Sequence, residues 1–153
     1  MFDPVQLHEA LDRIPSGSWS QPSTYEQTGV HDGYRIATLI SGGRLLPVAE
    51  PFRFVLDRYE PVHWAFLSCI DPGGFIVTHR DGGPWRERWH VPIVTAGSFL
   101  QGDDILDLVD GVPFQVRHWE RHSIDNPTGR TRIHLVIDRD ITIDRPVEPF
   151  VTY

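Results

Sequence analysis

The sequence has little of what builds several common classes of protein. Its single cysteine, Cys69, excludes an internal disulfide framework and a cysteine-rich zinc site, and it suits a reducing compartment. No stretch approaches the roughly 18 apolar residues of a membrane span. The N-terminus lacks the basic start and apolar run of a signal peptide. From these absences we expect a cytoplasmic protein with no membrane partner.

Basic residues are also scarce. The sequence has 14 Lys and Arg residues against 21 Asp and Glu, which gives a net charge of −7. A nucleic-acid-binding surface normally presents a basic face, so we expect no nucleic-acid partner. The length of 153 residues fits one domain. We divide it into a helical or irregular part at 1–60, a β core at 61–138 and an extended tail at 139–153.

The N-terminal part is expected to contain one or two short helices and a strand. Asp3 followed by Pro4 is typical of a helix N-cap and the first helical residue. A strand is predicted at residues 33–40, and a second helix is predicted at residues 52–59.

From Val62 onward the pattern changes to short strands separated by turn residues. Strands are predicted at 62–70, 75–79, 88–95, 98–101, 105–109, 114–124 and 130–138, with turns at 71–74, 110–111 and 126–129. About seven short strands with this spacing indicate an all-β sandwich or barrel. The fold that we expect is a double-stranded β-helix, the cupin-like jelly roll.

Three side chains form a candidate metal site: His79, Asp81 and His122. Residues two apart on a strand point to the same side, so His79 and Asp81 can converge on one ion. A facing strand of the jelly roll would supply His122. Two imidazoles and one carboxylate, with other positions open, are the ligands of non-haem Fe(II) oxygenases. The alternative for the His-x-Asp tripeptide is a polar surface loop.

His118 and His122 form a competing pair, four residues apart. On a helix they would share a face, as in helical zinc sites. The segment 114–122 follows a turn and has a strand pattern, in which four residues span roughly 13 Å. That distance is too long for one ion, so we expect His118 to lie at the rim or on the surface.

The segment from Ser68 to Arg132 resembles the aspartyl/asparaginyl β-hydroxylase family. It covers under half of the chain but contains the whole presumed site in the family's order. The motifs that carry the resemblance are Ser68-x3-Pro72-Gly73-x5-His79, Arg88-x-His90, Asp110-Gly111, and His122 followed ten residues later by Arg132.

The resemblance implies an Fe(II)- and 2-oxoglutarate-dependent hydroxylase that uses molecular oxygen. His79 and His122 would be the iron histidines, and Asp81 takes the place of a carboxylate ligand that animal members replace with glycine. Arg86 would contact a carboxylate on a small-molecule or peptide substrate, such as an amino acid or an acidic residue. The residues implied to contact 2-oxoglutarate are Ser68, Arg88, His90 and Arg132.

The strand pattern supports the binding of 2-oxoglutarate by Arg132 independently of the family resemblance. Ile133, Leu135 and Ile137 share one face of their predicted strand, so Arg132 and His134 share the other. A buried arginine without an anionic partner is costly, so an inward Arg132 needs an anion such as the distal carboxylate of 2-oxoglutarate. The alternative is an outward arginine in water.

Two other functions fit the same residues. A cupin-type metalloenzyme that works without 2-oxoglutarate would need the metal ligands but not Arg132. A non-catalytic binding module on the same fold would bind iron weakly or not at all, since a fold does not determine a function.

Overall fold

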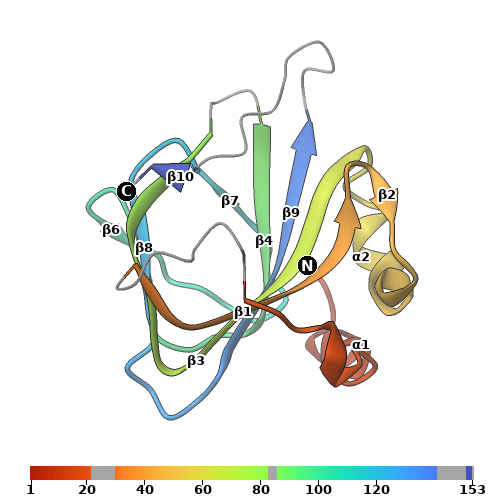
Figure 1. Ribbon diagram of the computed structural model, residues 1–153, viewed down its shortest axis with the longest axis horizontal. Coiled ribbons are helices and arrows are strands. Elements are labelled where there is room, and N and C mark those ends of the chain that lie inside the picture. The colour runs from red at the N-terminus through yellow and green to blue at the C-terminus, as the bar shows by residue number, and fades with distance from the viewer. Residues whose placement is uncertain (22–29, 83–85, 141–150, 153) are drawn as a thin grey trace.

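The computed structural model describes residues 1–21, 30–82, 86–140 and 151–152, and within them it is built mainly of strands (Figure 1). The helical segments are α1 (Pro4–Asp12), η1 (Ser16–Ser18), η3 (Pro47–Phe52) and α2 (Arg53–Leu56), where η marks a 3-10 helix. The strands are β1 (His31–Ser41), β2 (Arg44–Leu45), β3 (Val62–Asp81), β4 (Arg86–Val94), β5 (Ser98–Gln101), β6 (Asp104–Ile105), β7 (Phe114–Val116), β8 (His122–Asp125), β9 (Arg132–Asp140) and β10 (Val151–Thr152).

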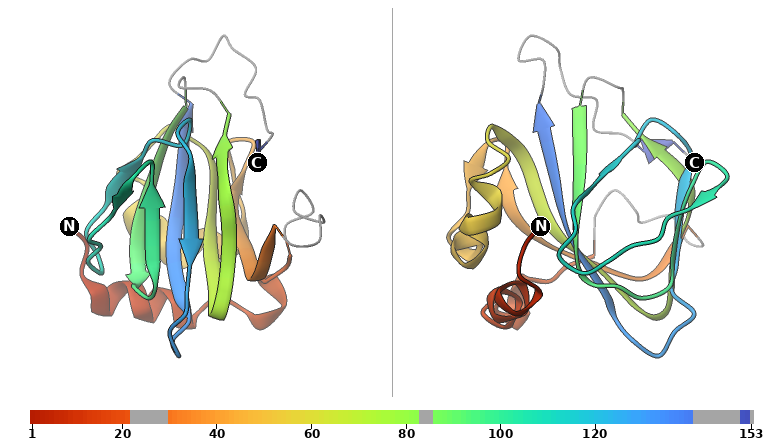
Figure 2. Two further views of the ribbon diagram at one scale, coloured as in Figure 1. Left: turned by 90° about the vertical axis from the view of Figure 1, so that its left-hand side faces the viewer. Right: turned by 180° about the vertical axis from the view of Figure 1, so that it is seen from behind.

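The strands form one antiparallel sheet that curls into a jelly roll. Seven of them follow the order β6-β5-β8-β3-β9-β4-β7, and β1 and β10 add to β3. The first half of β3 pairs with β9 and its second half pairs with β8, so this strand connects the two walls of the fold. As a result, β5 and β8 face β4 and β9 across an interior (Figures 1 and 2).

The long strand β3 replaces two predicted strands. We predicted a turn at residues 71–74, but the chain bulges there and continues, because the segment keeps partners on a neighbouring loop. The Gly73 N–H donates to the Asn126 carbonyl at 2.7 Å, and the Asn126 N–H donates to the Gly74 carbonyl at 2.9 Å. Gly73 has a φ of +78°, which glycine adopts without strain. The bulge bends β3 from one wall into the other.

Two other predicted strands are wrong in extent. The strand predicted at 114–124 is two strands, β7 and β8, separated by a turn. The Arg117 N–H donates to Gln101 Oε1 at 2.8 Å and the Glu120 N–H donates to the Arg117 carbonyl at 2.9 Å, so these groups leave the sheet ladder. The strand predicted at 105–109 is reduced to the two-residue β6.

The N-terminal elements are close to those predicted. Asp3 caps α1, because its side chain accepts a hydrogen bond from the Val5 N–H at 2.9 Å. The strand predicted at 33–40 is confirmed as β1. The helix predicted at 52–59 is shorter than expected: α2 has four residues and follows the 3-10 helix η3. Pro51 lies inside η3, where it has no N–H to donate and disfavours a regular α-helix.

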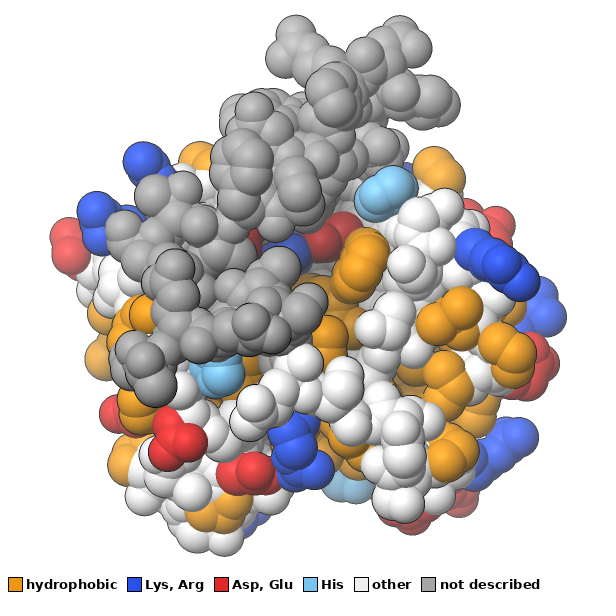
Figure 3. Space-filling model, in the orientation of Figure 1, with side chains coloured by type: hydrophobic (Ala, Val, Ile, Leu, Met, Phe, Trp, Pro, Cys, Tyr) orange, Lys and Arg blue, Asp and Glu red, His pale blue; other side chains and the backbone are white. Residues whose placement is uncertain are grey.

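Two hydrophobic clusters lie on opposite faces of the sheet. The larger one fills the space between the outer face and the helices, which cover that face (Figure 2). The smaller one lines the interior and consists of Tyr34, Ile70, Ile76, Phe99, Val116 and Ile124. Acidic, basic and hydrophobic side chains lie together at the centre of the face drawn in Figure 3. The interior combines this apolar cluster with buried charged side chains, among them Arg132 and Asp138.

The predicted tail at 139–153 is described in part. Strand β9 extends to Asp140, and β10 pairs antiparallel with the end of β3, while residues 141–150 and 153 lie outside the described part. No helix among the described residues is long and apolar enough to cross a membrane.

Candidate metal centre and anion cavity

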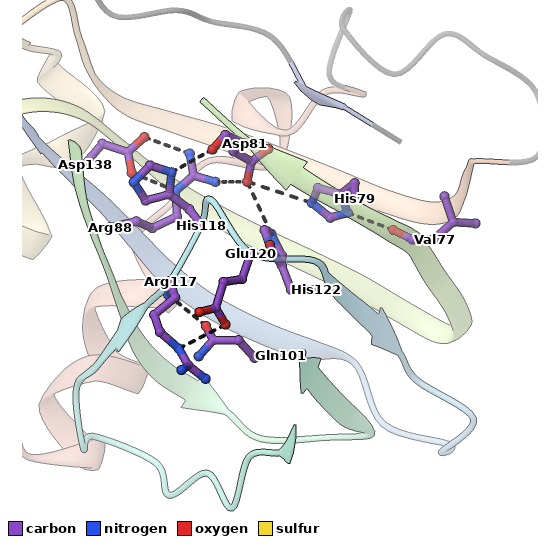
Figure 4. A network of polar contacts seen from close by, with 10 residues as sticks. All are labelled: Val77, His79, Asp81, Arg88, Gln101, Arg117, His118, Glu120, His122 and Asp138. Carbon is purple, nitrogen blue, oxygen red and sulfur yellow. Dashed lines mark hydrogen bonds and ion pairs between the residues drawn. The ribbon is translucent and has the colours of Figure 1, made fainter. Parts of the chain in front are cut away.

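His79, Asp81 and His122 converge in the interior (Figure 4). His79 and Asp81 lie at the end of β3, and His122 starts β8 as the direct ladder partner of His79. One nitrogen or oxygen of each residue lies within 4.8 Å of the others. His122 Nε2 is 3.3 Å and His79 Nε2 is 3.9 Å from Asp81 Oδ2. The structure thus brings the three predicted ligands together, and all three are buried.

Backbone carbonyls orient both imidazole rings. His79 Nδ1 lies 2.7 Å from the Val77 carbonyl oxygen, and His122 Nδ1 lies 2.9 Å from that of Glu120. A carbonyl can only accept, so each Nδ1 carries the proton and each Nε2 presents a lone pair towards Asp81. Two lone pairs and a carboxylate oxygen repel one another unless a cation lies between them. The set of donor atoms therefore fits a divalent metal.

The protonation states also suit a metal. Burial lowers the pKa of His79, which favours the neutral imidazole that a metal binds. Burial by itself would raise the pKa of the Asp81 carboxyl, but neighbouring groups, with the charge of Arg88 first among them, outweigh it and hold that pKa well below its usual range. Asp81 is therefore ionised at neutral pH.

His118 is fully buried, so the prediction of a rim or surface position is wrong. The reason is the turn between β7 and β8, which carries the residue inward instead of along a strand. Its ring Nδ1 donates to the Asp81 carbonyl at 2.8 Å, and its own carbonyl accepts from the Asp81 N–H at 2.7 Å. These two bonds fix the backbone of one candidate ligand to the turn that leads into His122.

Arg88, on β4, connects Asp81 to a second carboxylate. Its Nη1 donates to Asp81 Oδ2 at 2.6 Å, and its Nε and Nη2 donate to the two oxygens of Asp138 at 2.7 and 2.8 Å (Figure 4). Asp138 is 1% exposed and was not among the predicted site residues. The alternation that puts Arg132 and His134 on the inner face of β9 extends to Asp138 and could have identified it.

Arg132 lies in the interior with 1% of its surface exposed. Its Nη2 donates to His134 Nδ1 at 2.9 Å, whereas its Nη1 has no hydrogen-bond partner among the described residues. None of the described carboxylates forms an ion pair with it, and burial lowers the pKa of Arg132 to about 10. A buried cation without an anionic partner is costly, so this position favours binding of an anion.

His90 continues the polar chain that starts at Arg132. His134 Nδ1 accepts from Arg132, so it carries no proton, and His90 Nδ1 must donate to the same atom over 3.2 Å. Burial, and then the charge of Arg132, lowers the pKa of both histidines well below the usual range. His134 Nε2 then carries a proton that has no partner among the described residues.

A cavity of about 120 Å³ lies beside Arg132 and His134, under the loops that follow β4 and β6. Phe99 lines this cavity and also contacts the metal centre. Its ring stacks on His122 with a centroid distance of 5.9 Å and an interplanar angle of 4°, and Arg132 Cζ lies 5.9 Å from the centroid of the same ring. Arg132 and a candidate metal ligand are therefore separated by one aromatic ring.

The remaining predicted contacts differ in how far the structure describes them. Ser68 is buried, is the ladder partner of His134 and hydrogen-bonds to the Tyr34 hydroxyl, whose pKa burial raises to about 12. Ser68 thus borders the same polar chain as Arg132. Arg86 begins β4, but its side chain lies outside the described part of the chain.

No protein-family model and no curated protein sequence matches the chain. Solved structures do match it. An oxidoreductase of the 2OG-Fe(II) oxygenase family from Burkholderia pseudomallei has a TM-score of 0.67 at 14% identity, over 88% of this chain and 76% of that one. A cupin-2 domain protein from Rhodospirillum rubrum has a TM-score of 0.57 at 14% identity, over 86% and 74%. A cupin 2 conserved barrel domain protein from Rhodopseudomonas palustris has a TM-score of 0.55 at 16% identity, over 84% of this chain and 83% of that one.

These likenesses confirm the predicted fold class, the double-stranded β-helix of cupin domains. The similar structures differ in kind, since they also include a predicted oxalate decarboxylase from Thermotoga maritima, with a TM-score of 0.53 at 14% identity over 82% of this chain and 96% of that one. The fold therefore does not select one reaction. None of these comparisons bears on the aspartyl/asparaginyl β-hydroxylase family specifically, so that resemblance stays a prediction.

Proposed function

We propose that this protein is an Fe(II)- and 2-oxoglutarate-dependent oxygenase that hydroxylates an unactivated C–H bond of a carboxylate-bearing substrate. The observation that supports this most directly is the buried Arg132, whose Nη1 lacks a partner among the described residues, one aromatic ring away from a His-Asp-His ligand set. A cupin metalloenzyme that works without 2-oxoglutarate would use the ligand set but would supply no anion to Arg132.

In this proposal each part of the interior has one task. His79, Asp81 and His122 hold the iron, which supplies the oxidising chemistry together with oxygen and 2-oxoglutarate. Arg132 binds the distal carboxylate of 2-oxoglutarate, whose carbon chain extends past the Phe99 ring. Burial of Arg132 keeps bulk water away from this charge-assisted pair and strengthens it. The expected coproducts are succinate and CO2.

The test of the proposed activity is aerobic incubation with Fe(II) and 2-oxoglutarate. Amino acids and acidic peptides are screened by mass spectrometry for the gain of one oxygen atom, and succinate is measured in the same samples. We expect succinate to form in proportion to the oxidised product. A protein that binds iron but neither binds nor consumes 2-oxoglutarate would support the cupin-type alternative.

Replacing Arg132 with methionine should weaken 2-oxoglutarate binding by roughly 10- to 100-fold, since a hydrogen bond to a charged group contributes roughly 1.5–3 kcal/mol. Methionine retains much of the packing against Phe99 but has no donor. Without 2-oxoglutarate, the same variant should be at least as stable as the wild type, because it removes a buried unpaired cation. Calorimetry with metal-loaded protein under anaerobic conditions measures the first effect, and thermal unfolding measures the second.

The matched control is Arg130→Met, which removes an exposed arginine two residues earlier in the chain. It should change neither the affinity nor the unfolding temperature by much. Wild-type affinity for 2-oxoglutarate in Arg132→Met would exclude the proposed binding of the cosubstrate.

We also propose that Arg86 binds the substrate carboxylate. It begins β4 two residues before Arg88, which contacts Asp81, and a guanidinium can bind a carboxylate through two parallel hydrogen bonds. Arg86→Ala should raise the substrate KM by about tenfold or more. Turnover of 2-oxoglutarate without substrate should stay near the wild-type rate. An unchanged KM would show that Arg86 does not contact the substrate.

A further inference from the structure

The Asp81 carboxylate is oriented by a side chain that is itself held by a second carboxylate. We infer that Arg88 and Asp138 form a positioning pair that keeps Asp81 in its metal-binding orientation. The inference rests on the metal centre of the proposed function and goes beyond it, because it assigns Arg88 a role other than contact with 2-oxoglutarate. Among the described residues, Arg88 connects Asp138 to Asp81, and Asp138 acts on the metal site through it.

The geometry of the guanidinium supports this role. Its donors form a rigid planar fork, so the two bonds from Nε and Nη2 to Asp138 fix its plane and the direction of Nη1. Nη1 in turn holds Asp81 Oδ2, the oxygen that lies 3.3 Å from His122 Nε2 and 3.9 Å from His79 Nε2. Without Nη1, rotation about the side-chain torsions of Asp81 could turn this oxygen away from the histidines.

Asp138 also limits how strongly Arg88 binds Asp81. A free arginine binds a carboxylate through two parallel bonds, which would occupy both oxygens of Asp81 and compete with a metal. Here Asp138 takes up Nε and Nη2, and Nη1 donates to Asp81 Oδ2. The side chains of Asp138, Asp81 and Arg88 are 2%, 7% and 14% exposed, so water cannot easily substitute for any of them.

The same two strands carry a matched control pair. Arg88 and Asp138 are ladder partners on β4 and β9, and the next pair along the ladder is Glu87 with Arg139. Arg139 Nη1 lies 2.8 Å from Glu87 Oε2, and because side chains alternate, this ion pair faces away from the interior. Removing it tests what an ion pair between β4 and β9 contributes to stability alone.

The experiment measures Co(II) affinity by competition with a chelator, and records the visible spectrum of the Co(II)-loaded protein. Arg88→Gln should lower the affinity by about 10- to 100-fold and change the spectrum, as expected when a group that orients a ligand is lost. Asp138→Asn should act in the same direction. Arg88→Lys should lower the Co(II) affinity nearly as much, because lysine keeps the charge but lacks the planar donor fork of the guanidinium. Glu87→Gln and Arg139→Gln should leave both readouts unchanged.

The double variant of Arg88→Gln with Asp138→Asn should bind Co(II) no more weakly than Arg88→Gln alone, since Asp138 acts through Arg88. Far-UV circular dichroism and thermal unfolding of each variant check the fold, and Asp138→Asn preserves the side-chain shape if Arg88→Gln does not fold. At saturating metal, unchanged affinity of Arg88→Gln for 2-oxoglutarate supports positioning, whereas a large loss supports the cosubstrate contact that the family resemblance implies.

Two results would overturn the inference: wild-type Co(II) affinity and spectrum in both Arg88→Gln and Asp138→Asn, or equal losses in the Glu87 and Arg139 variants. A different result would contradict the proposed function. If the wild type binds Co(II) and Arg88→Gln weakens it, but 2-oxoglutarate is never consumed, the positioning pair stands and the oxygenase assignment falls. A wild type that binds no divalent metal overturns both.

Discussion

His122→Ala is expected to lower the affinity for Fe(II) by more than about 100-fold and to abolish turnover of 2-oxoglutarate. Loss of a group that merely orients a ligand costs about 10- to 100-fold, and loss of the ligand itself should cost more. The variant leaves two ligands, His79 and Asp81, on one strand, with no donor from β8 to close the site. Chelator competition under anaerobic conditions gives the affinity, and succinate formation gives the turnover.

His63→Ala is the matched control, because His63 lies on β3 with His79 but outside the ligand set. It should bind iron like the wild type. If His122→Ala did so too, the assignment of the three ligands would be wrong. Asp81→Gly is a finer test: the predicted family resemblance implies glycine at this position in animal members, so loss of all activity would show that this chain depends on its carboxylate.

The metal-free protein is expected to lose about 3 kcal/mol of stability when the pH falls from 7.5 to 5.5. Burial, and then Arg132, lowers the pKa of His90 and His134 well below the usual range, so both stay neutral in the folded protein. In the unfolded chain they take up protons below a pH of about 6.5. The unfolded state therefore binds more protons as the pH falls, and the two histidines together cost about 3 kcal/mol one pH unit below that value.

Urea unfolding of the metal-free protein at the two pH values measures this effect. Burial also lowers the pKa of His79, which adds to the loss in the same direction. His134→Gln should lose less stability on acidification than the wild type, because one of the buried imidazoles is gone. His8→Gln removes an exposed histidine and should behave like the wild type. Equal stability at both pH values would contradict the assignment of neutral buried histidines.

Local patterns in the sequence were enough to predict most of the fold. Alternation of apolar residues and the positions of glycine and proline depend only on neighbouring residues, and they predicted β1, β4, β5, β9 and the jelly-roll class. The predictions that failed lie where a distant partner decides the backbone. Asn126 turns residues 71–74 into a bulge within β3, and Gln101 holds the turn that separates β7 from β8.

In the candidate site, too, local sequence predicted some features and distant partners decided the others. The direction of a side chain on a strand follows from its position, so His79 and Asp81 were predicted to share a face, as were Arg132 and His134. Register between strands depends on contacts that are distant in the sequence. Only the pairing of β4 with β9 places Arg88 opposite Asp138, and only the turn after β7 buries His118 against Asp81. The sequence alone determined which residues could hold a metal and an anion, and tertiary structure decided which side chains hold them in place.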